Sequence, residues 1–328
     1  MSSNTRDWYG VNLAAARLGA QAIYTNDDFF APKERLLQDH DAVFIEGKYD
    51  DNGKWMDGWE SRRKRQEGYD YCIVKLGVSG RIDMLDIDTR HFTGNYPPAA
   101  RVQACFTDSV PDEQTVWSDI TDTVALAGNQ QHLIEVADNG VYNHVRLNIY
   151  PDGGVARLRV YGQPDVDWQH QADHQVDLLA LENGGRAISC NDQHFGTIHN
   201  LNLPGRGLNM GDGWETRRRR EPGNDWVIMA LGHAGEIDSV VVDTAYFKGN
   251  YPNACSIQVA NVADLPESSL AAQSIFWQEL LPKQLLQADH EHHYQAELNK
   301  VGTVTHIRLN IFPDGGISRL RLFGKPSF

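Results

Sequence analysis

The sequence predicts an all-β protein that consists of two copies of one antiparallel β-sandwich domain. Three sequence blocks occur twice and in the same order, about 160 residues apart. Within each copy, apolar and polar residues alternate with a period of two, as they do in half-buried strands. Many short strands with few helical segments are typical of an antiparallel sandwich. The long period indicates a tandem duplication, because solenoid repeats are much shorter.

The first repeated block is rich in charged residues. Asp57–Arg65 returns as Asp212–Arg220, with seven of nine positions identical. An extended backbone places Glu60 and Arg62 on one face of this block. An Arg fork can hold a carboxylate through two parallel hydrogen bonds, and a neighbouring Glu can exchange a proton with a leaving nitrogen. The alternative interpretation is a solvated edge strand whose charges prevent aggregation.

The second block follows at the same offset. Asp88–Pro97 returns as Asp243–Pro252, 155 residues later. It predicts a loop that leaves a strand and presents Asn and Tyr side chains, either to a ligand or to the core. The two Asp residues either hold their loops by hydrogen bonds or act in catalysis.

The third block predicts a β-hairpin. Arg146–Gly154 returns as Arg308–Gly316, now 162 residues later. Alternating residues continue to 161, and Pro151–Gly154 supplies the turn between the two strands. Arg146 and Asn148 share one strand face, where they either clamp a small anion or pair with side chains across the sheet.

Domain boundaries follow from the repeats. We expect one domain over residues 1–165, a second over 176–328 and a polar, acidic linker over 166–175. Repeat one carries ten extra residues around Lys33–Trp55, which indicates a loop insertion. Helical pattern is confined to short pieces at Asn12–Leu18, Pro32–Gln38 and Ser274–Leu281.

Composition narrows the class of protein. The net charge of −14 argues against binding to a nucleic-acid backbone. Met1–Tyr24 lacks the order of a signal peptide, and no apolar run approaches the ~20 residues of a membrane helix, so we expect a cytoplasmic protein without a membrane partner. The four cysteines stand singly, which predicts reduced thiols. His290–His293 has no counterpart at the 162-residue offset and fits no standard zinc spacing, which favours a surface loop.

Several longer segments together resemble the allantoicase family over nearly the whole chain. They are Trp55–Arg63, Met210–Arg218, the two segments ending in Gly-Asn-Tyr-Pro, the two segments ending in Pro-Asp-Gly-Gly, and Asp27–Lys33. The resemblance implies two tandem jelly-roll domains of the galactose-binding-like type. It also implies hydrolysis of allantoate to ureidoglycolate and urea in allantoin and purine catabolism. It carries no assignment of catalytic residues.

Candidate site residues are therefore chosen by chemistry and repetition. The predicted catalytic residues are Glu60, Glu215, Asp57 and Asp212. The predicted substrate-binding residues are Arg62, Arg63, Arg217, Arg218, Asn95, Tyr96, Asn250, Tyr251, Arg146, Asn148, Arg308 and Asn310. A divalent cation such as Mn²⁺ could bridge Asp or Glu and polarise a ureido carbonyl, although the sequence has no fixed ligand set. We expect a homo-oligomer, as acidic metabolic enzymes often are.

Two other classes of function stay open at this point. A tandem carbohydrate-binding module without catalytic activity would use the same fold, with aromatic, Asn and Arg side chains at its loop tips. An interaction protein that kept the fold and lost the activity is the third class. The sequence also leaves open whether both repeats carry a site, although the insertion makes the repeats unequal.

Overall fold

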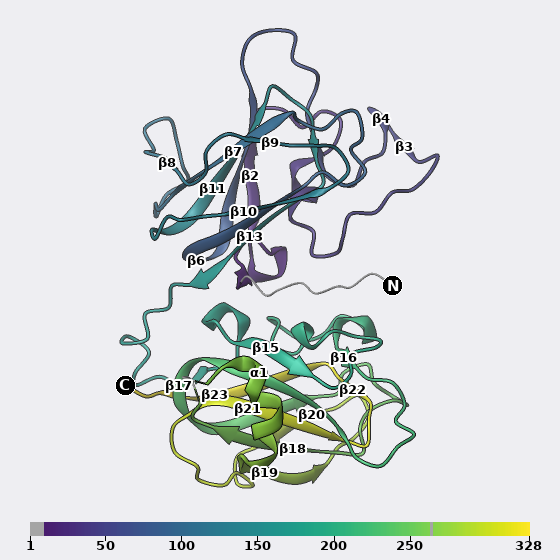
Figure 1. Ribbon diagram of the computed structural model, residues 1–328, viewed down its shortest axis with the longest axis vertical. Coiled ribbons are helices and arrows are strands. Elements are labelled where there is room, and N and C mark those ends of the chain that lie inside the picture. Colours follow the sequence, from purple (N-terminus) through teal and green to yellow (C-terminus); the bar gives the residue numbers. More distant parts are fainter. Residues whose placement is uncertain (1–9, 263–264) are drawn as a thin grey trace. The chain divides into compact units, whose positions relative to one another are not determined.

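The computed structural model describes residues 10–262 and 265–328 (Figure 1). The chain divides into two compact units, of which one ends at Asp165 and the other begins at Val166. Strands dominate both units. The segment 166–175, predicted as a linker, is grouped with the second unit, where the Trp168 ring lies 4.9 Å from the ring of His233.

The first unit is organised around one long strand, β6 (Asp70–Asp88). Its first half pairs with β2 (Gln21–Thr25) and mainly with β11 (Val141–Tyr150). Its second half pairs with β10 (Gln131–Glu135) and β13 (Arg157–Pro164). All four pairings are antiparallel. Since its two halves have different neighbours, β6 belongs to both layers of the unit.

The other elements of the first unit extend the sheets or connect them. The remaining sheet strands are β1 (Val11–Asn12), β7 (Ala99–Cys105), β8 (Ser118–Asp119) and β9 (Val124–Ala125). Two-residue strands form small separate ladders, namely β3 (Tyr49–Asp50) with β4 (Gly53–Lys54), and β5 (Trp59–Glu60) with β12 (Gly154–Val155). The 3-10 turns are η1 (Ala16–Leu18) and η2 (Lys33–Leu37).

The second unit repeats this plan around β17 (Asp225–Asp243). The first half of β17 pairs with β15 (Arg186–Cys190) and β21 (Val304–Phe312), and the second half with β20 (Glu291–Tyr294) and β23 (Arg319–Pro326). The remaining elements are β14 (Val176–Asp177), η3 (Leu181–Asn183), η4 (Ile198–Asn200), η5 (Met210–Asp212), β16 (Trp214–Glu215), β18 (Ala254–Ala260), α1 (Glu267–Gln273), η6 (Ser274–Phe276), β19 (Gln278–Leu285) and β22 (Gly316–Ile317).

One core lies between the layers of each unit. In the second unit, Val227 from the first half of β17 and Val242 from its second half belong to the same buried cluster, together with Leu309 of β21 and Leu320 of β23. The alternating apolar residues of the third block, such as Leu147 and Leu158, are likewise buried in the first unit. The predicted all-β fold of two tandem jelly-roll sandwiches is therefore confirmed.

The predicted hairpin in the third block is wrong. β11 and β13 do not pair with each other, because β11 lies beside β6 and β7 while β13 lies beside β6 and β1. Pro151–Gly154 does turn the chain, but it carries the chain from one layer to the other. Local alternation cannot distinguish these cases, since a strand that changes layer keeps the same period of two.

The helix predicted at Ser274–Leu281 is also misplaced. The α-helix covers Glu267–Gln273, a 3-10 turn follows over Ser274–Phe276, and β19 already begins at Gln278. Pro266 precedes the first helical residue, where proline favours helix initiation. Leu280 and Leu281 lie in β19 and are buried in the core.

Two further observations concern the whole described chain. Across residues 10–262 and 265–328, no helix has the length and apolarity needed to cross a lipid bilayer. All four cysteines are free thiols, and three of them are buried.

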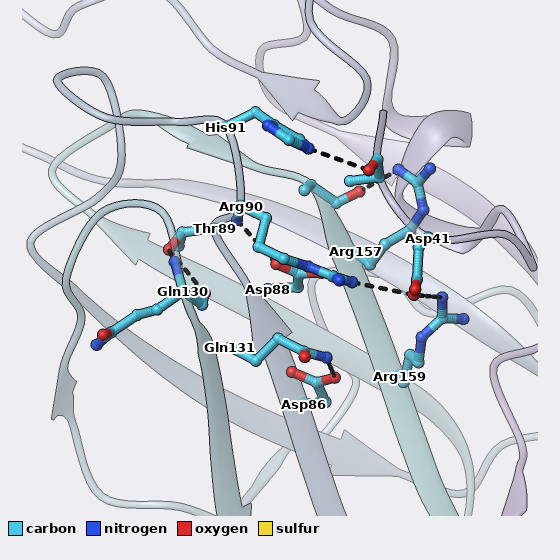
Figure 2. A network of polar contacts seen from close by, with 12 residues as sticks. Asp41, Asp86, Asp88, Thr89, Arg90, His91, Gln130, Gln131, Arg157 and Arg159 are labelled. Carbon is cyan, nitrogen blue, oxygen red and sulfur yellow. Dashed lines mark hydrogen bonds and ion pairs between the residues drawn. The ribbon is translucent and has the colours of Figure 1, made fainter. Parts of the chain in front are cut away.

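The outer face of β6 carries a polar network that the second unit lacks in part (Figure 2). Asp86 is 2% exposed, and its carboxylate accepts a 2.7 Å hydrogen bond from Gln131. Burial, and then the charge of Asp88, raise the pKa of Asp86 to about 6. The equivalent residue of β17 is Val241, which pairs with His293 of β20 as Asp86 pairs with Leu133 of β10.

We expect Asp86→Asn to stabilise the first unit at pH 7.5 by about 1–3 kcal/mol. With its pKa raised in the folded state, Asp86 favours folding below pH 4, and this contribution is lost as the pH rises through about 6. Asn keeps an oxygen for Gln131 and carries no charge. Urea denaturation of both proteins between pH 4.5 and 8 measures the effect. A variant that is less stable than the wild type at pH 7.5 would contradict it.

Candidate functional site

The three repeated blocks meet at the glycine pair of the third block. Ser61 N–H donates to the Gly153 carbonyl at 3.1 Å, and Gly154 N–H donates to the Asn95 carbonyl at 2.7 Å. The Phe92 ring fills the space above Gly154, where a Cβ atom would lie 2.0 Å from a ring carbon. Gly153 has a φ of 141°, which side chains rarely tolerate. The three blocks are therefore joined by backbone hydrogen bonds at Gly153–Gly154, and this meeting point is called the junction.

The second unit repeats the junction atom for atom. Thr216 N–H donates to the Gly315 carbonyl at 3.1 Å, and Gly316 N–H donates to the Asn250 carbonyl at 2.8 Å. Phe247 covers Gly316 as Phe92 covers Gly154. Trp59 and Trp214 are fully buried beside these junctions, so the aromatic residue of the first block has a packing role.

The junction brings the predicted Glu and Asn residues together in both units. Asn95 donates from Nδ2 to Glu60 Oε1 at 2.6 Å, and Asn250 donates to Glu215 Oε1 at 2.5 Å. Burial raises the pKa of the Glu60 carboxyl; the Asn95 hydrogen bond lowers it, and the nearby Asp50 charge raises it further. A carboxylate of raised pKa is a stronger base, which suits proton exchange near neutral pH.

An Arg two residues after each Glu forms an ion pair. Arg62 Nε donates to Asp27 Oδ2 at 2.7 Å, and Arg217 Nε donates to Asp192 Oδ1 at 2.9 Å. Although burial alone would raise it, the hydrogen bonds from Arg62 and Phe29 hold the pKa of Asp27 below its ordinary value. Arg62 is 61% exposed despite this pairing, so part of its guanidinium still faces solvent.

A pocket of about 410 Å³ opens beside this ion pair in the second unit. Its lining is Asn191, Asp192, Arg217, Arg218, Arg219, Arg220, Glu221 and Asp225. Arg217 and Arg219 are held by Asp192 and Asp225. Within the described part of the chain, Arg218 and Arg220 have no ion-pair partner, so both can bind an anion. Arg63 and Arg65 are their exposed counterparts in the first unit.

Asp57 and Asp212, predicted as catalytic, occupy a different environment. Asp57 accepts from Arg157 at 2.7 Å, and both side chains are almost completely buried. Asp212 accepts from Arg319 at 2.9 Å in the same way. Their catalytic assignment stays a prediction, but the geometry gives both carboxylates a structural task, which is to fasten the first block to β13 or β23.

Arg146 and Asn148 form a separate cluster with Gln103 on the outer face of β11. Arg146 Nε donates to Gln103 Oε1 at 2.9 Å, and Asn148 Nδ2 donates to the same oxygen at 3.1 Å. In the second unit, Arg308 donates to Asn310 at 2.9 Å, and Asn310 donates to Gln258 at 3.1 Å. Asn148 is fully buried, so a bound anion could reach only the Arg of this cluster.

Tyr96 and Tyr251 are half-buried against apolar residues. Tyr96 packs on the small cluster that contains Phe92, and Tyr251 packs on the main core of the second unit. Their predicted contact with substrate is untested, but their rings serve the packing of the junction.

Sequence reasoning missed Asp27, Asp192 and Asp50 as members of the site. The first two stand in a segment that is itself repeated at an offset of 165, and this was the available signal. Asp50 lies in the insertion and has no counterpart to align with. The histidine run was also misaligned, since β10 and β20 match His292 to His132. Each of these rings donates from Nδ1 to a strand carbonyl, that of Val242 for His292 and that of Ile87 for His132.

No preformed metal centre accompanies these residues. Over residues 10–262 and 265–328, no group of three or more His, Cys, Asp or Glu side chains is arranged to hold an ion. The predicted Mn²⁺ has therefore gained no ligand set and stays a prediction.

The fold and the paired sites define a duplicated jelly-roll protein with a polar corner rich in Arg in each half. A family model described as the allantoicase repeat matches residues 11–165 and 176–327. The chain belongs to the allantoicase family.

Individual relatives agree with this assignment. The chain is 60% identical to a probable allantoicase of Stutzerimonas stutzeri, covering 96% of both chains. It is 59% identical to probable allantoicase 1 of Burkholderia mallei, covering 96% of this chain and 94% of that one. The crystal structure of allantoicase from Saccharomyces cerevisiae is similar with a TM-score of 0.81 and 34% identity, over 96% of this chain and 92% of that one.

We expect Asp57→Ala to lower the free energy of unfolding by about 3–5 kcal/mol, because it leaves the fully buried Arg157 without its counter-charge. Asp212→Ala should do the same in the second unit. Thermal and urea denaturation measure the loss, with exposed Asp51→Ala as the matched control. If Asp57→Ala abolished activity and left stability unchanged, the structural role assigned here would be wrong.

Proposed function

We propose that this chain hydrolyses allantoate to ureidoglycolate and urea, and that the Glu–Asn pair beside the Arg residues of the first block carries the reaction. Membership of the allantoicase family supports the reaction. The observation that supports the site is the Asn95–Glu60 hydrogen bond and its exact repetition as Asn250–Glu215. The alternative of a non-catalytic carbohydrate-binding module is not favoured.

The reaction needs a small number of groups. Allantoate is a carboxylate whose central carbon bears two ureido arms and one hydrogen. One bond from this carbon to a ureido nitrogen breaks, and a bond to the oxygen of water forms. The hydroxyl of water stays on carbon, and its other hydrogen goes to the leaving nitrogen, so that urea departs neutral and nothing is oxidised or reduced.

Each group has a candidate in the structure. Arg63, with the exposed part of Arg62, would hold the substrate carboxylate by forked hydrogen bonds. The Asn95 amide orients Glu60 and has polar atoms for a ureido arm. Glu60 would take the proton of water as the carbon–oxygen bond forms and would then give a proton to the leaving nitrogen. Holding these groups in place lowers the entropic part of the barrier.

The double variant Glu60→Gln with Glu215→Gln tests the assigned carboxylates. We expect kcat for urea release to fall by about 10²–10⁴-fold, the range typical of a lost acid–base group. Gln still accepts the Asn hydrogen bonds, so circular dichroism and Tm should not change. Wild-type protein that releases no urea from allantoate but binds sugars in a calorimeter would overturn the proposed function itself.

Arg63→Ala with Arg218→Ala tests the carboxylate subsite. Losing a charge-assisted hydrogen bond costs about 1.5–3 kcal/mol, so KM should rise by about 10–100-fold while kcat changes less. Arg81→Ala removes an exposed Arg that pairs with Asp83 and is the matched control. Equal KM values for the wild type, the double variant and Arg81→Ala would exclude Arg63 and Arg218 as substrate ligands.

Two further predictions belong to this function. The participation of Mn²⁺ is decided by dialysis against EDTA, followed by assay with and without added Mn²⁺.

We also propose that the chain self-associates, because Val43, Phe44 and Ile45 form an exposed apolar run of 42–45% relative accessibility. Light scattering coupled to gel filtration measures the mass. A cytoplasmic location stays a prediction.

A further inference from the structure

The two Glu–Asn pairs are alike, but their surroundings differ. In the first unit the insertion forms the β3–β4 hairpin, and this ladder has no counterpart among the described residues of the second unit. The hairpin approaches the chain that flanks Glu60. Asn52 Nδ2 donates to the Phe29 carbonyl at 2.7 Å, and the following residue, Phe30, donates its N–H to the Glu60 carbonyl at 3.2 Å.

The hairpin is anchored from its other side as well. Arg35 NH1 donates to the Met56 carbonyl at 2.6 Å, and Arg35 NH2 lies 3.9 Å from Asp50 Oδ2. The Trp55 ring lies under two cations, with Lys48 Nζ at 3.7 Å and the Arg35 guanidinium at 5.3 Å. These contacts hold Asp50 on a hairpin that lies against the segment paired with Glu60.

Burial raises the pKa of the Glu60 carboxyl, the Asn95 hydrogen bond lowers it, and the negative charge of Asp50 raises it further. Arg35 Nη2 lies 3.9 Å from Asp50 Oδ2 and partly compensates its charge. An acid–base group for proton exchange with a nitrogen leaving group benefits from such a neighbour, because its basicity increases.

The second unit offers binding without this second carboxylate. Met210 stands where the first unit has Trp55, and its Sδ lies 3.9 Å from Asn250 Nδ2. The pocket that Asp192 and Arg217 line also contains Arg218 and Arg220, which have no ion-pair partner in the described ranges 10–262 and 265–328, and the carboxylate of Glu221. This site has the forked donors that a small carboxylate requires, next to an apolar thioether.

We propose that the repeats have divided their roles: the first unit turns substrate over with Glu60 as catalytic residue and Asp50 as positioning residue, and the second unit binds a small carboxylate anion without converting it. This inference rests on the proposed function. It assigns the β3–β4 hairpin as the element that distinguishes a catalytic repeat from a binding repeat.

The pH profile of Asp50→Asn is the first test. Glu60 must start as a carboxylate, so kcat/KM falls below its pKa. Removing the neighbouring negative charge lowers that pKa, and the acidic limb should move to lower pH. A merely structural role of Asp50 would lower activity without moving the limb. Asp51→Asn, on the same hairpin, is the matched control, and Asp50→Glu should restore the wild-type limb.

Single variants of the two Glu residues are the second test. Glu60→Gln should lower kcat at least about 100-fold, whereas Glu215→Gln should lower it less than about tenfold. Equal losses in the two variants would overturn the division of roles. So would an acidic limb that Asp50→Asn leaves in place in a protein whose Tm is unchanged.

Titration of allantoate into Glu60→Gln by calorimetry counts the sites. We expect two sites per chain, of which Arg218→Ala removes one and Arg63→Ala the other. A single site, lost only with Arg63→Ala, would exclude binding by the second unit. Failure of the proposed function is distinguishable from failure of this inference, because in the former the wild-type protein itself releases no urea.

Discussion

The structure depends on the close approach of backbones at Gly153–Gly154 and at its twin Gly315–Gly316. No side chain fits there, since Phe92 and Phe247 already fill the space above the second glycine of each pair. The first and second blocks dock on this pair through backbone hydrogen bonds. The position of each Glu–Asn pair is thus set by main-chain geometry, which gives the precision that a catalytic group requires.

Ion pairs stabilise this junction at two depths below the surface. Deep in each unit a buried Arg–Asp pair, Arg157 with Asp57 or Arg319 with Asp212, fastens the first block to the last strand. Nearer the surface, Arg62 and Arg217 pair with Asp27 and Asp192 while remaining largely exposed. Acidic and basic residues of one short sequence block therefore serve quite different purposes, depending on which way each side chain points.

Much of this could be predicted from the sequence, because duplication reveals what a single copy hides. The repeats gave the domain plan, and chemistry selected Glu60 and Arg62. Three things escaped. The layer change at Pro151–Gly154 is a long-range property of β6, which local periodicity does not contain. The structural task of Asp57 could not be foreseen because its partner Arg157 stands 100 residues away. Asp50 could not be identified by comparing the two repeats, because it lies in an insertion that only the first repeat carries.

Because β6 belongs to both layers of the sandwich, it limits how the sequence of such a protein can vary. A strand that belongs to two sheets cannot shift in one of them without disturbing the other, so the sandwich resists variation at its centre. The β3–β4 hairpin, Tyr49–Lys54, is mostly exposed and lies outside that constraint, with polar contacts such as the Asn52 hydrogen bond to the Phe29 carbonyl. Evolution can lengthen, shorten or replace it while the junction stays intact, and one copy of a duplicated gene product is free to do so while the other preserves the original surface.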